Sequence, residues 1–284
     1  MNDPKRIHET RYIYAAPGIV IIWRNSLKLK VYLTCIKISI AQATAYRADF
    51  IMSTFITLLS NVFFPLVTIV IYANGLEFPG WTMWEVLALQ SIFSLSRGIA
   101  SMCLSSVMWA TMDHVRGGSF ETVLLKPISP LFYIMTTNFS VSQIGLVVGS
   151  AIVLAISLIN TGVSGVLGVL SAIVLFIGGI LVAAGLFLIM AAISFIWVGN
   201  SRLDEISSSV SNFGNYPLQI FGYGLRIVMA FVIPAGMIGS LPAEVLLKGV
   251  EPLYFLGLIP CVLVLMFGIW IYNRMIKRYE GVGG

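Results

Sequence analysis

Long apolar runs separated by short polar segments dominate the chain. A helix rises about 1.5 Å per residue, so about 20 apolar residues cross the roughly 30 Å hydrocarbon core of a bilayer. Six runs have this length, and the predicted spans are 50–73, 84–110, 132–158, 166–197, 218–240 and 253–272. The fourth is longer than one bilayer requires, and glycines and a proline interrupt the fifth. The pattern predicts an all-α polytopic membrane protein with six transmembrane helices.

The composition agrees with a membrane location. Of the 284 residues, 58% are hydrophobic and 10% are charged, whereas about 25% of the residues of a soluble domain are charged. So few charges could not cover a surface that faces water. We therefore expect a transmembrane domain over 50–272, preceded by an N-terminal region, 1–49, and followed by a tail, 273–284.

Basic residues indicate which ends of the spans face the cytoplasm. Fourteen of the seventeen lysines and arginines lie in 1–49, in the loops after the second and fourth predicted spans, and in 273–284. Positive charge in short loops marks the cytoplasmic side of a membrane. Both termini are therefore predicted to be cytoplasmic, as an even number of spans requires. The net charge of +5 reflects topology and does not indicate a nucleic-acid partner.

Residues 22–46 are also apolar enough to form a helix near the membrane. Lys28, Lys30 and Lys37 would make a spanning position costly. The segment is therefore predicted to lie along the cytoplasmic membrane surface, with its lysines near anionic lipid headgroups.

The chain offers little catalytic chemistry. It contains no GxxxxGK[ST] phosphate-binding loop, so it is not expected to hydrolyse ATP by that route. His8 and His114 have no second metal ligand at the usual spacing. No aspartate or glutamate lies near the middle of a predicted span, where carriers driven by ion gradients commonly hold the coupling ion. No catalytic residue, metal site or cofactor is predicted on this chain.

Two arginines, Arg97 and Arg226, fall inside predicted spans. A charge in lipid is costly, so each should face the protein interior or water. One interpretation is a substrate pathway in which they contact an anionic group. The other is a structural arginine that bonds carbonyl groups or extends to the membrane surface, and the sequence leaves both open.

The segment 113–132, DHVRGGSFETVLLKPISPLF, is polar and punctuated, unlike its apolar flanks. The glycine pair that includes Gly118 should end the preceding helix. Ser119 can cap a new helix, and Glu121 in its first turn favours the helix dipole. Pro127 should end that helix, because the residue before a proline avoids helical conformation. The pattern predicts a short cytoplasmic helix outside the membrane.

One side of this short helix, 119–126, is apolar. Phe120, Val123 and Leu124 are spaced three and four residues apart and share a face. That face is predicted to bind a groove on a partner. The alternative is a capped surface turn that has no partner.

The short helix carries a resemblance to a known family. The pattern G-x-x-E-x-x-L-x-x-P-x-S is formed by Gly118, Glu121, Leu124, Pro127 and Ser129. It resembles the cytoplasmic loop of ABC-2-type exporter permeases, in the branch that lacks a fused ATPase domain. The layout of a basic N-terminal helix, six spans and a broken segment before the last span is also similar.

The resemblance implies a transmembrane permease subunit of an ATP-driven ABC exporter in a prokaryotic inner membrane. A coupling helix would dock on a separate ABC ATPase subunit, which would hold ATP and Mg, and this chain would not itself be an enzyme. Two permeases, identical or paralogous, would form the pathway within the membrane lipid. The cargo would be a lipid-linked glycan, a peptide or an amphipathic drug. The implied coupling residues are Arg116, Gly118, Phe120, Glu121, Val123, Leu124 and Pro127.

Other classes compete with the permease. An ion-gradient-driven carrier or a membrane-embedded enzyme acting alone would not need a partner ATPase, and the missing acids and metal ligands count against both. A scaffold subunit would not need a capped cytoplasmic helix. A neighbouring gene for a soluble ATPase with a phosphate loop would separate the permease from these classes.

Overall fold

Five helices of the computed structural model are long and apolar enough to cross a membrane. The structure describes residues 30, 32–41, 45, 47–197 and 202–279, and within these it contains helices and no strand. The spanning helices are α2 (Arg47–Ala73), α3 (Met83–Arg116), η2 with α6 (Val141–Gln143 and Ile144–Thr161), α7 (Val166–Ile193), and η7 with α11 (Pro252–Gly257 and Leu258–Ile276). The predicted all-helical membrane fold is confirmed.

Helix α3 is longer than its predicted span. It begins with a capping box in which the Thr82 side chain accepts from the Glu85 backbone N–H and the Glu85 side chain accepts from that of Thr82. It then runs for 34 residues, about 50 Å. It ends at Gly117, and Gly118 takes a positive φ of 67°, a conformation that glycine adopts without steric cost. The end of α3 therefore projects beyond one bilayer thickness.

The prediction of one helix over 132–158 is wrong. Helix α5 (Pro130–Thr137) ends at Asn138, and α6 begins only at Ile144. The Asn138 side chain donates to the Ile134 carbonyl oxygen at 3.0 Å, and the Ser140 backbone N–H donates to the Met102 carbonyl oxygen at 3.0 Å. The Ser140 N–H thus pairs with α3 and not with a carbonyl of α5, and a polar side chain that bonds nearby backbone competes with the helix. The chain turns here before it crosses.

The prediction of a spanning helix over 218–240 is also wrong. A series of short pieces occupies the chain between α7 and α11: α8 (Leu203–Asn212), η3 (Phe213–Asn215), η4 (Leu218–Ile220), α9 (Tyr223–Ile227), the π-helix η5 (Val228–Val232), η6 (Ala235–Ile238) and α10 (Ser240–Lys248). Pro217 and Pro234 lack the N–H group that a continuous helix requires. Gly222 lies in an extended break before α9.

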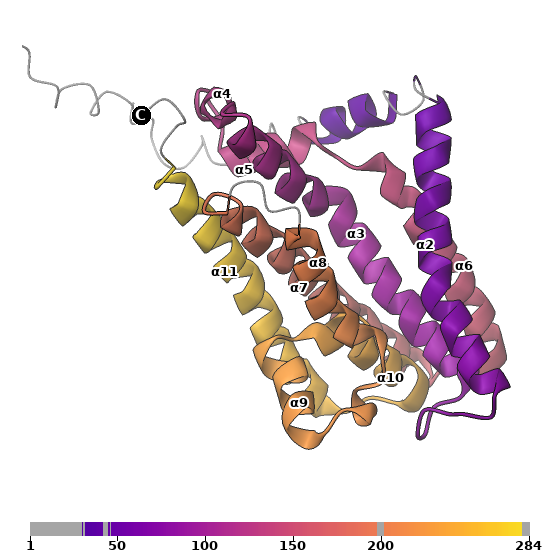
Figure 1. Ribbon diagram of the computed structural model, residues 1–284. Coiled ribbons are helices and arrows are strands. Elements are labelled where there is room, and N and C mark those ends of the chain that lie inside the picture. The colour runs from indigo at the N-terminus through magenta and orange to yellow at the C-terminus, as the bar shows by residue number, and fades with distance from the viewer. Residues whose placement is uncertain (1–29, 31, 42–44, 46, 198–201, 280–284) are drawn as a thin grey trace, which may run out of the picture.

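These pieces nevertheless carry the chain from one end of the helix bundle to the other. Phe195, just after α7, packs against Phe120 of the short helix α4 (Phe120–Leu124). At the opposite end, the Ser164 hydroxyl donates to the Val245 carbonyl oxygen of α10 at 2.9 Å. The chain between 195 and 245 therefore passes through the bundle by way of α8. As a result, α2 begins and α11 ends at the end that holds α4 and α5 (Figure 1).

The centre of the bundle is α7, which packs against α3 on one side and α11 on the other (Figure 1). Glycines permit the contact with α11. A Cβ atom placed on Gly268 would lie 2.8 Å from the Gly185 carbonyl oxygen, and one on Gly185 would lie 2.9 Å from that of Val264. Such close backbone approach stabilises helix pairs where lipid provides no hydrophobic driving force.

About half of the predicted surface helix over 22–46 lies outside the described residues. Lys30 and residues 32–41 are helical. The Tyr32 hydroxyl lies 3.3 Å from the Cys103 sulfur of α3. This contact attaches the described part of the segment to the bundle, and its position on the membrane surface stays a prediction.

Candidate functional site

Helix α4 follows α3 after a tight turn at Gly118. The Ser119 backbone N–H donates to the His114 carbonyl oxygen at 2.9 Å, and the Ser119 hydroxyl lies 2.8 Å from His114 Nδ1. The predicted capping bond from the Ser119 side chain to the first turn of α4 is absent, because that hydroxyl is engaged by the histidine. The turn therefore fixes α4 to the last turn of α3.

An aromatic cluster of Phe120, Phe195, Tyr272 and Tyr279 holds the inner side of α4. The Phe120 ring meets those of Phe195 and Tyr279 edge to face, with centroid distances of 4.9 and 5.2 Å. Phe195 also meets Tyr272 at 5.7 Å, and the Tyr272 hydroxyl lies 2.9 Å from the Thr111 hydroxyl. Residues on α3, α4 and α11 and just after α7 thus meet in one packed cluster.

The predicted partner-facing side of α4 needs correction. Phe120 and Val123 are 0% and 1% exposed and pack inside the chain's own core, so they are not available to a partner in this structure. Leu124 does face outward, together with Leu125 and Ile128, with exposed fractions of 41%, 78% and 41%. We call these last three residues the exposed ridge.

Exposed charged residues flank the exposed ridge along the chain. Arg116 is exposed in the last turn of α3, and Glu121 is exposed in the first turn of α4. The Lys126 ammonium lies 5.8 Å from the centroid of the Tyr133 ring. Pro127 is exposed after α4, close to the start of α5. An apolar centre with a charged rim is the usual anatomy of a protein interface.

Arg97 lies partly buried on α3, where it makes no hydrogen bond within the part of the chain that the structure describes. The charge of Asp204, at the start of α8, attracts it. Helix α8 is polar: Glu205 and Ser209 are exposed, and Ser208 is partly exposed. These polar groups belong to the series of short helices that runs through the bundle between α7 and α11.

One contact shows how far along the bundle the residues after α8 lie. A Cβ atom placed on Gly214, just after α8, would lie 3.4 Å from the Phe93 ring. Phe93 is ten residues into α3, about 15 Å from the start of that helix. Next to Gly214, Asn215 is 1% exposed, and neither polar atom of its side chain has a hydrogen-bond partner among the described residues. Buried side-chain amides without a hydrogen-bond partner are rare in folded proteins, and this one lies beside the polar groups of α8.

Arg226 occupies a different place from Arg97. It lies on α9, and its guanidinium donates to the Gln219 carbonyl oxygen at 3.3 Å. The Gln219 side chain in turn bonds Trp81, which precedes α3. Arg97 is about 20 Å along α3 from that end, so the two predicted pathway arginines do not form one site.

Sequence reasoning missed most of the aromatic cluster. Tyr272 was the last residue of a predicted span, and Tyr279 lies in the predicted tail. The available signal was the apolar pair Met275–Ile276, which continues the helical face of α11 beyond residue 272. No group of three or more potential metal ligands occurs among the residues that the structure describes.

The fold defines a polytopic helical membrane protein with a short helix packed across one end of its bundle. A family model for ABC-2 family transporter proteins matches residues 50–283. The chain therefore belongs to the ABC-2 transporter family, whose permeases generally work with an ABC ATPase. A comparison with curated proteins gives no significant match.

Proposed function

We propose that the chain is the permease subunit of an ATP-driven exporter and that α4 is its coupling helix. The observation that carries this proposal is the two-sided packing of α4. Its inner side, Phe120 and Val123, is buried in the bundle, while the exposed ridge of Leu124, Leu125 and Ile128 faces outward. A helix with this arrangement can receive a partner on one side and pass its movement to the bundle on the other.

Movement of α4 would reach three spanning helices. The aromatic cluster connects Phe120 to Tyr272 of α11 and to Phe195 beside α7, and the turn at Gly118 connects α4 to α3. Packed interiors transmit displacement because they contain few voids. Closure of an ATPase pair on ATP and Mg would shift α4, and α3, α7 and α11 would move with it. The chemistry of hydrolysis belongs to the partner, so this chain is not an enzyme.

A second permease would face the polar side of α8. Glu205 and Ser209 are exposed in the single chain and lie four residues apart on one helical face. Polar and charged groups at membrane depth face protein or water and avoid lipid. Two permeases, identical or paralogous, would enclose a watery pathway between these faces, with Arg97 beside it.

The α4 end of the bundle is proposed to be cytoplasmic. Arg116, Lys126, Arg202 and Arg274 belong to this end, and basic residues in short loops remain on the cytoplasmic side. Both termini would then be cytoplasmic, and the chain would lie in a prokaryotic inner membrane.

Co-purification of a variant whose exposed ridge is altered tests the proposal. Leu125→Asp would bury an unpaired charge in the ATPase contact, which costs several kcal/mol. A tagged wild-type chain should retain a subunit that mass spectrometry identifies as carrying a phosphate loop and that hydrolyses ATP, and the variant should lose it. Leu76→Asp is the matched control, since Leu76 is 64% exposed after α2, at the opposite end. Retention of the ATPase by Leu125→Asp at wild-type levels would contradict a coupling role.

A further inference from the structure

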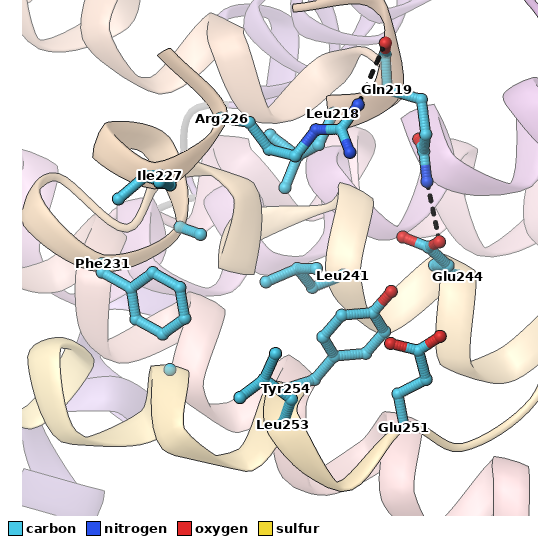
Figure 2. A pocket seen from close by; sticks show the side chains of 12 residues that line it. Leu218, Gln219, Arg226, Ile227, Phe231, Leu241, Glu244, Glu251, Leu253 and Tyr254 are labelled. Carbon is cyan, nitrogen blue, oxygen red and sulfur yellow. Dashed lines mark hydrogen bonds between the residues drawn. The ribbon is translucent and has the colours of Figure 1, made fainter. Parts of the chain in front are cut away.

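A cavity of about 440 Å³ lies at the end of the bundle opposite α4, between η4, α9, η5, α10 and η7 (Figure 2). One of its walls is apolar and consists of Leu218, Ile227, Phe231, Leu241 and Leu253. The π-helix η5 supplies Phe231, and the Ile233 backbone N–H donates to the Val228 carbonyl oxygen at 2.9 Å. Such i to i+5 turns occur frequently at functional sites.

The other wall is polar and is organised by Gln219. Its Oε1 accepts from Trp81 Nε1 at 3.2 Å, and its Nε2 donates to Glu244 Oε1 at 2.7 Å. The Gln219 carbonyl oxygen accepts from Arg226 Nη2 at 3.3 Å. One residue therefore holds a carboxylate and a guanidinium in fixed positions on either side of itself (Figure 2).

Two carboxylates and one guanidinium face the cavity. Glu251 and Glu244 lie on either side of the Tyr254 hydroxyl (Figure 2). Lys248, the cation of α10, makes its contacts outside the cavity: it donates to the Gly80 carbonyl oxygen, and its ammonium lies 3.8 Å from the centroid of the Trp81 ring. Its charge also favours the ionised form of Glu244, but it does not line the cavity. A guanidinium has five N–H donors, and Arg226 uses one of them at Gln219. The cavity therefore offers a ligand both carboxylate acceptors and free guanidinium donors.

The partial burial of Glu244 favours a cationic ligand. Desolvation raises the pKa of Glu244, and the nearby charge of Glu251 adds to this. The hydrogen bonds from Gln219 and Tyr254 and the charge of Lys248 lower this pKa in part. A raised pKa means that the surroundings of this carboxylate disfavour its ionised form. A ligand ammonium beside Glu244 would stabilise that ionised form, as an opposite charge does.

The geometry points to a site for an amphipathic molecule with a zwitterionic headgroup. Its ammonium contacts Glu244, Glu251 and Tyr254, its anionic group contacts Arg226, and its hydrocarbon chain lies along Phe231 and the rest of the apolar wall. Pockets with a largely apolar lining and a few oriented polar groups are typical of small-molecule sites. The inference deepens the proposed function and rests on it for one point, that the ligand is cargo or a lipid met at the outer end of the pathway.

Binding of three single-chain amphipaths to the purified full-length complex in detergent tests this site. The probes are lysophosphatidylethanolamine, which is zwitterionic, lysophosphatidylglycerol, which is only anionic, and dodecylamine, which is only cationic. Isothermal titration should give an affinity for the zwitterion at least about tenfold above that for either other probe, as charge-assisted hydrogen bonds of both signs would provide.

Two variants test which group of the ligand each charged side chain binds. Glu251→Gln should weaken binding of both the zwitterion and dodecylamine about tenfold, because both use the carboxylates. Arg226→Gln should weaken the zwitterion to a similar extent and leave dodecylamine unchanged or bound more tightly. Both residues are exposed, so folding should persist, and thermal unfolding in the same detergent checks this. Glu77→Gln is the control, since Glu77 is exposed in the loop after α2 and does not line the cavity.

Equal affinity for the three amphipaths, or variants within about twofold of wild type, would overturn the zwitterion site and leave nonspecific apolar binding. The same preparation is assayed for bound ATPase. A complex that retains its ATPase without headgroup selectivity contradicts only the site. A chain that selects the zwitterion but retains no ATPase contradicts only the proposed exporter.

Discussion

The ring of Phe120 packs edge to face on the ring of Phe195, with centroids 4.9 Å apart and planes at 88°. Phe120 is the first residue of α4, and Phe195 follows the last turn of α7. Edge-to-face pairs contribute about 0.5–1.5 kcal/mol beyond the burial of their area. This contact joins a helix at the end of the bundle to the residues that follow the central spanning helix. A displacement of α4 would therefore also displace the end of α7.

Phe120→Ala should weaken both folding and coupling. The side chain is 0% exposed, and removal of a buried phenylalanine costs about 3–5 kcal/mol. The melting temperature in detergent should fall, and ATP hydrolysis by the retained complex should lose its link to export. Leu125→Ala, at a site that is 78% exposed, should leave the melting temperature within about a degree, since surface substitutions typically change stability by less than about 0.5 kcal/mol. An unchanged melting temperature for Phe120→Ala would contradict the anchoring role of the aromatic cluster.

Gly118→Ala should displace α4. Gly118 has a φ of 67°, and an L-residue pays about 1–2 kcal/mol in that region. The Ser119 bonds to His114 would be strained, and ATPase retention should fall although the exposed ridge is intact. Gly118→Asn is the matched control, because asparagine tolerates the left-handed region better than alanine. Equal loss in both variants would show that the side chain itself, and not the backbone conformation, causes the defect.

Cysteine labelling tests the proposed orientation. In a background without Cys35, Cys103 and Cys261, single cysteines replace exposed residues at the two ends of the bundle. Those at Leu76 and Val163 should react with an impermeant maleimide added to intact cells, and those at Leu125 and Lys277 should not. The first three of these residues are 64%, 49% and 78% exposed, and Lys277 is also exposed. Labelling at Leu125 from outside would reverse the assignment of the cytoplasmic side.

Four other residues, Gly80, Gly162, Ser164 and Lys248, lie in the loops after the first, third and fifth predicted spans, on the side opposite the predicted cytoplasmic loops, but they are less suitable for labelling. Gly80 and Gly162 have positive φ values of 73° and 78°, so a cysteine would be strained there. Ser164 donates to the Val245 and Leu246 carbonyl oxygens, and Lys248 donates to Gly80. Ser164 and Lys248 thus hold α10 close to the starts of α7 and α3.

Four of the six predicted spans correspond to long helices because apolar length is a direct physical requirement of the bilayer. The other two predicted spans, 132–158 and 218–240, are broken by bonds and contacts at particular residues. Asn138 and Ser140 end α5 through side-chain and long-range backbone bonds, which a hydropathy pattern does not contain. In 218–240, the partners of Pro234 and its neighbours are on α7 and η3. The break therefore becomes stable only in the folded bundle.

The predicted coupling helix shows the same limit. Glycine and proline positions correctly placed α4, because both residues act on the local backbone. Its outward face was wrong for Phe120 and Val123, because a five-residue helix carries too little pattern to tell which apolar side chains pack inside. Phe195 and Tyr279, which decide this, are 75 and 159 residues away from Phe120 along the chain.

Arg97→Gln should separate a pathway arginine from a structural one. Arg97 makes no hydrogen bond among the described residues and is partly buried, so the substitution removes a desolvated charge at little structural cost. The melting temperature should change by no more than a few degrees, because the cost of desolvating the guanidinium offsets its attraction to Asp204. Export should fall about tenfold or more, as loss of a charged contact worth about 1.5–3 kcal/mol predicts, while ATPase retention stays normal. Arg274→Gln, at an exposed position in the last turn of α11, should change neither quantity. A parallel loss of melting temperature and export in Arg97→Gln would instead identify Arg97 as a structural residue and remove it from the pathway.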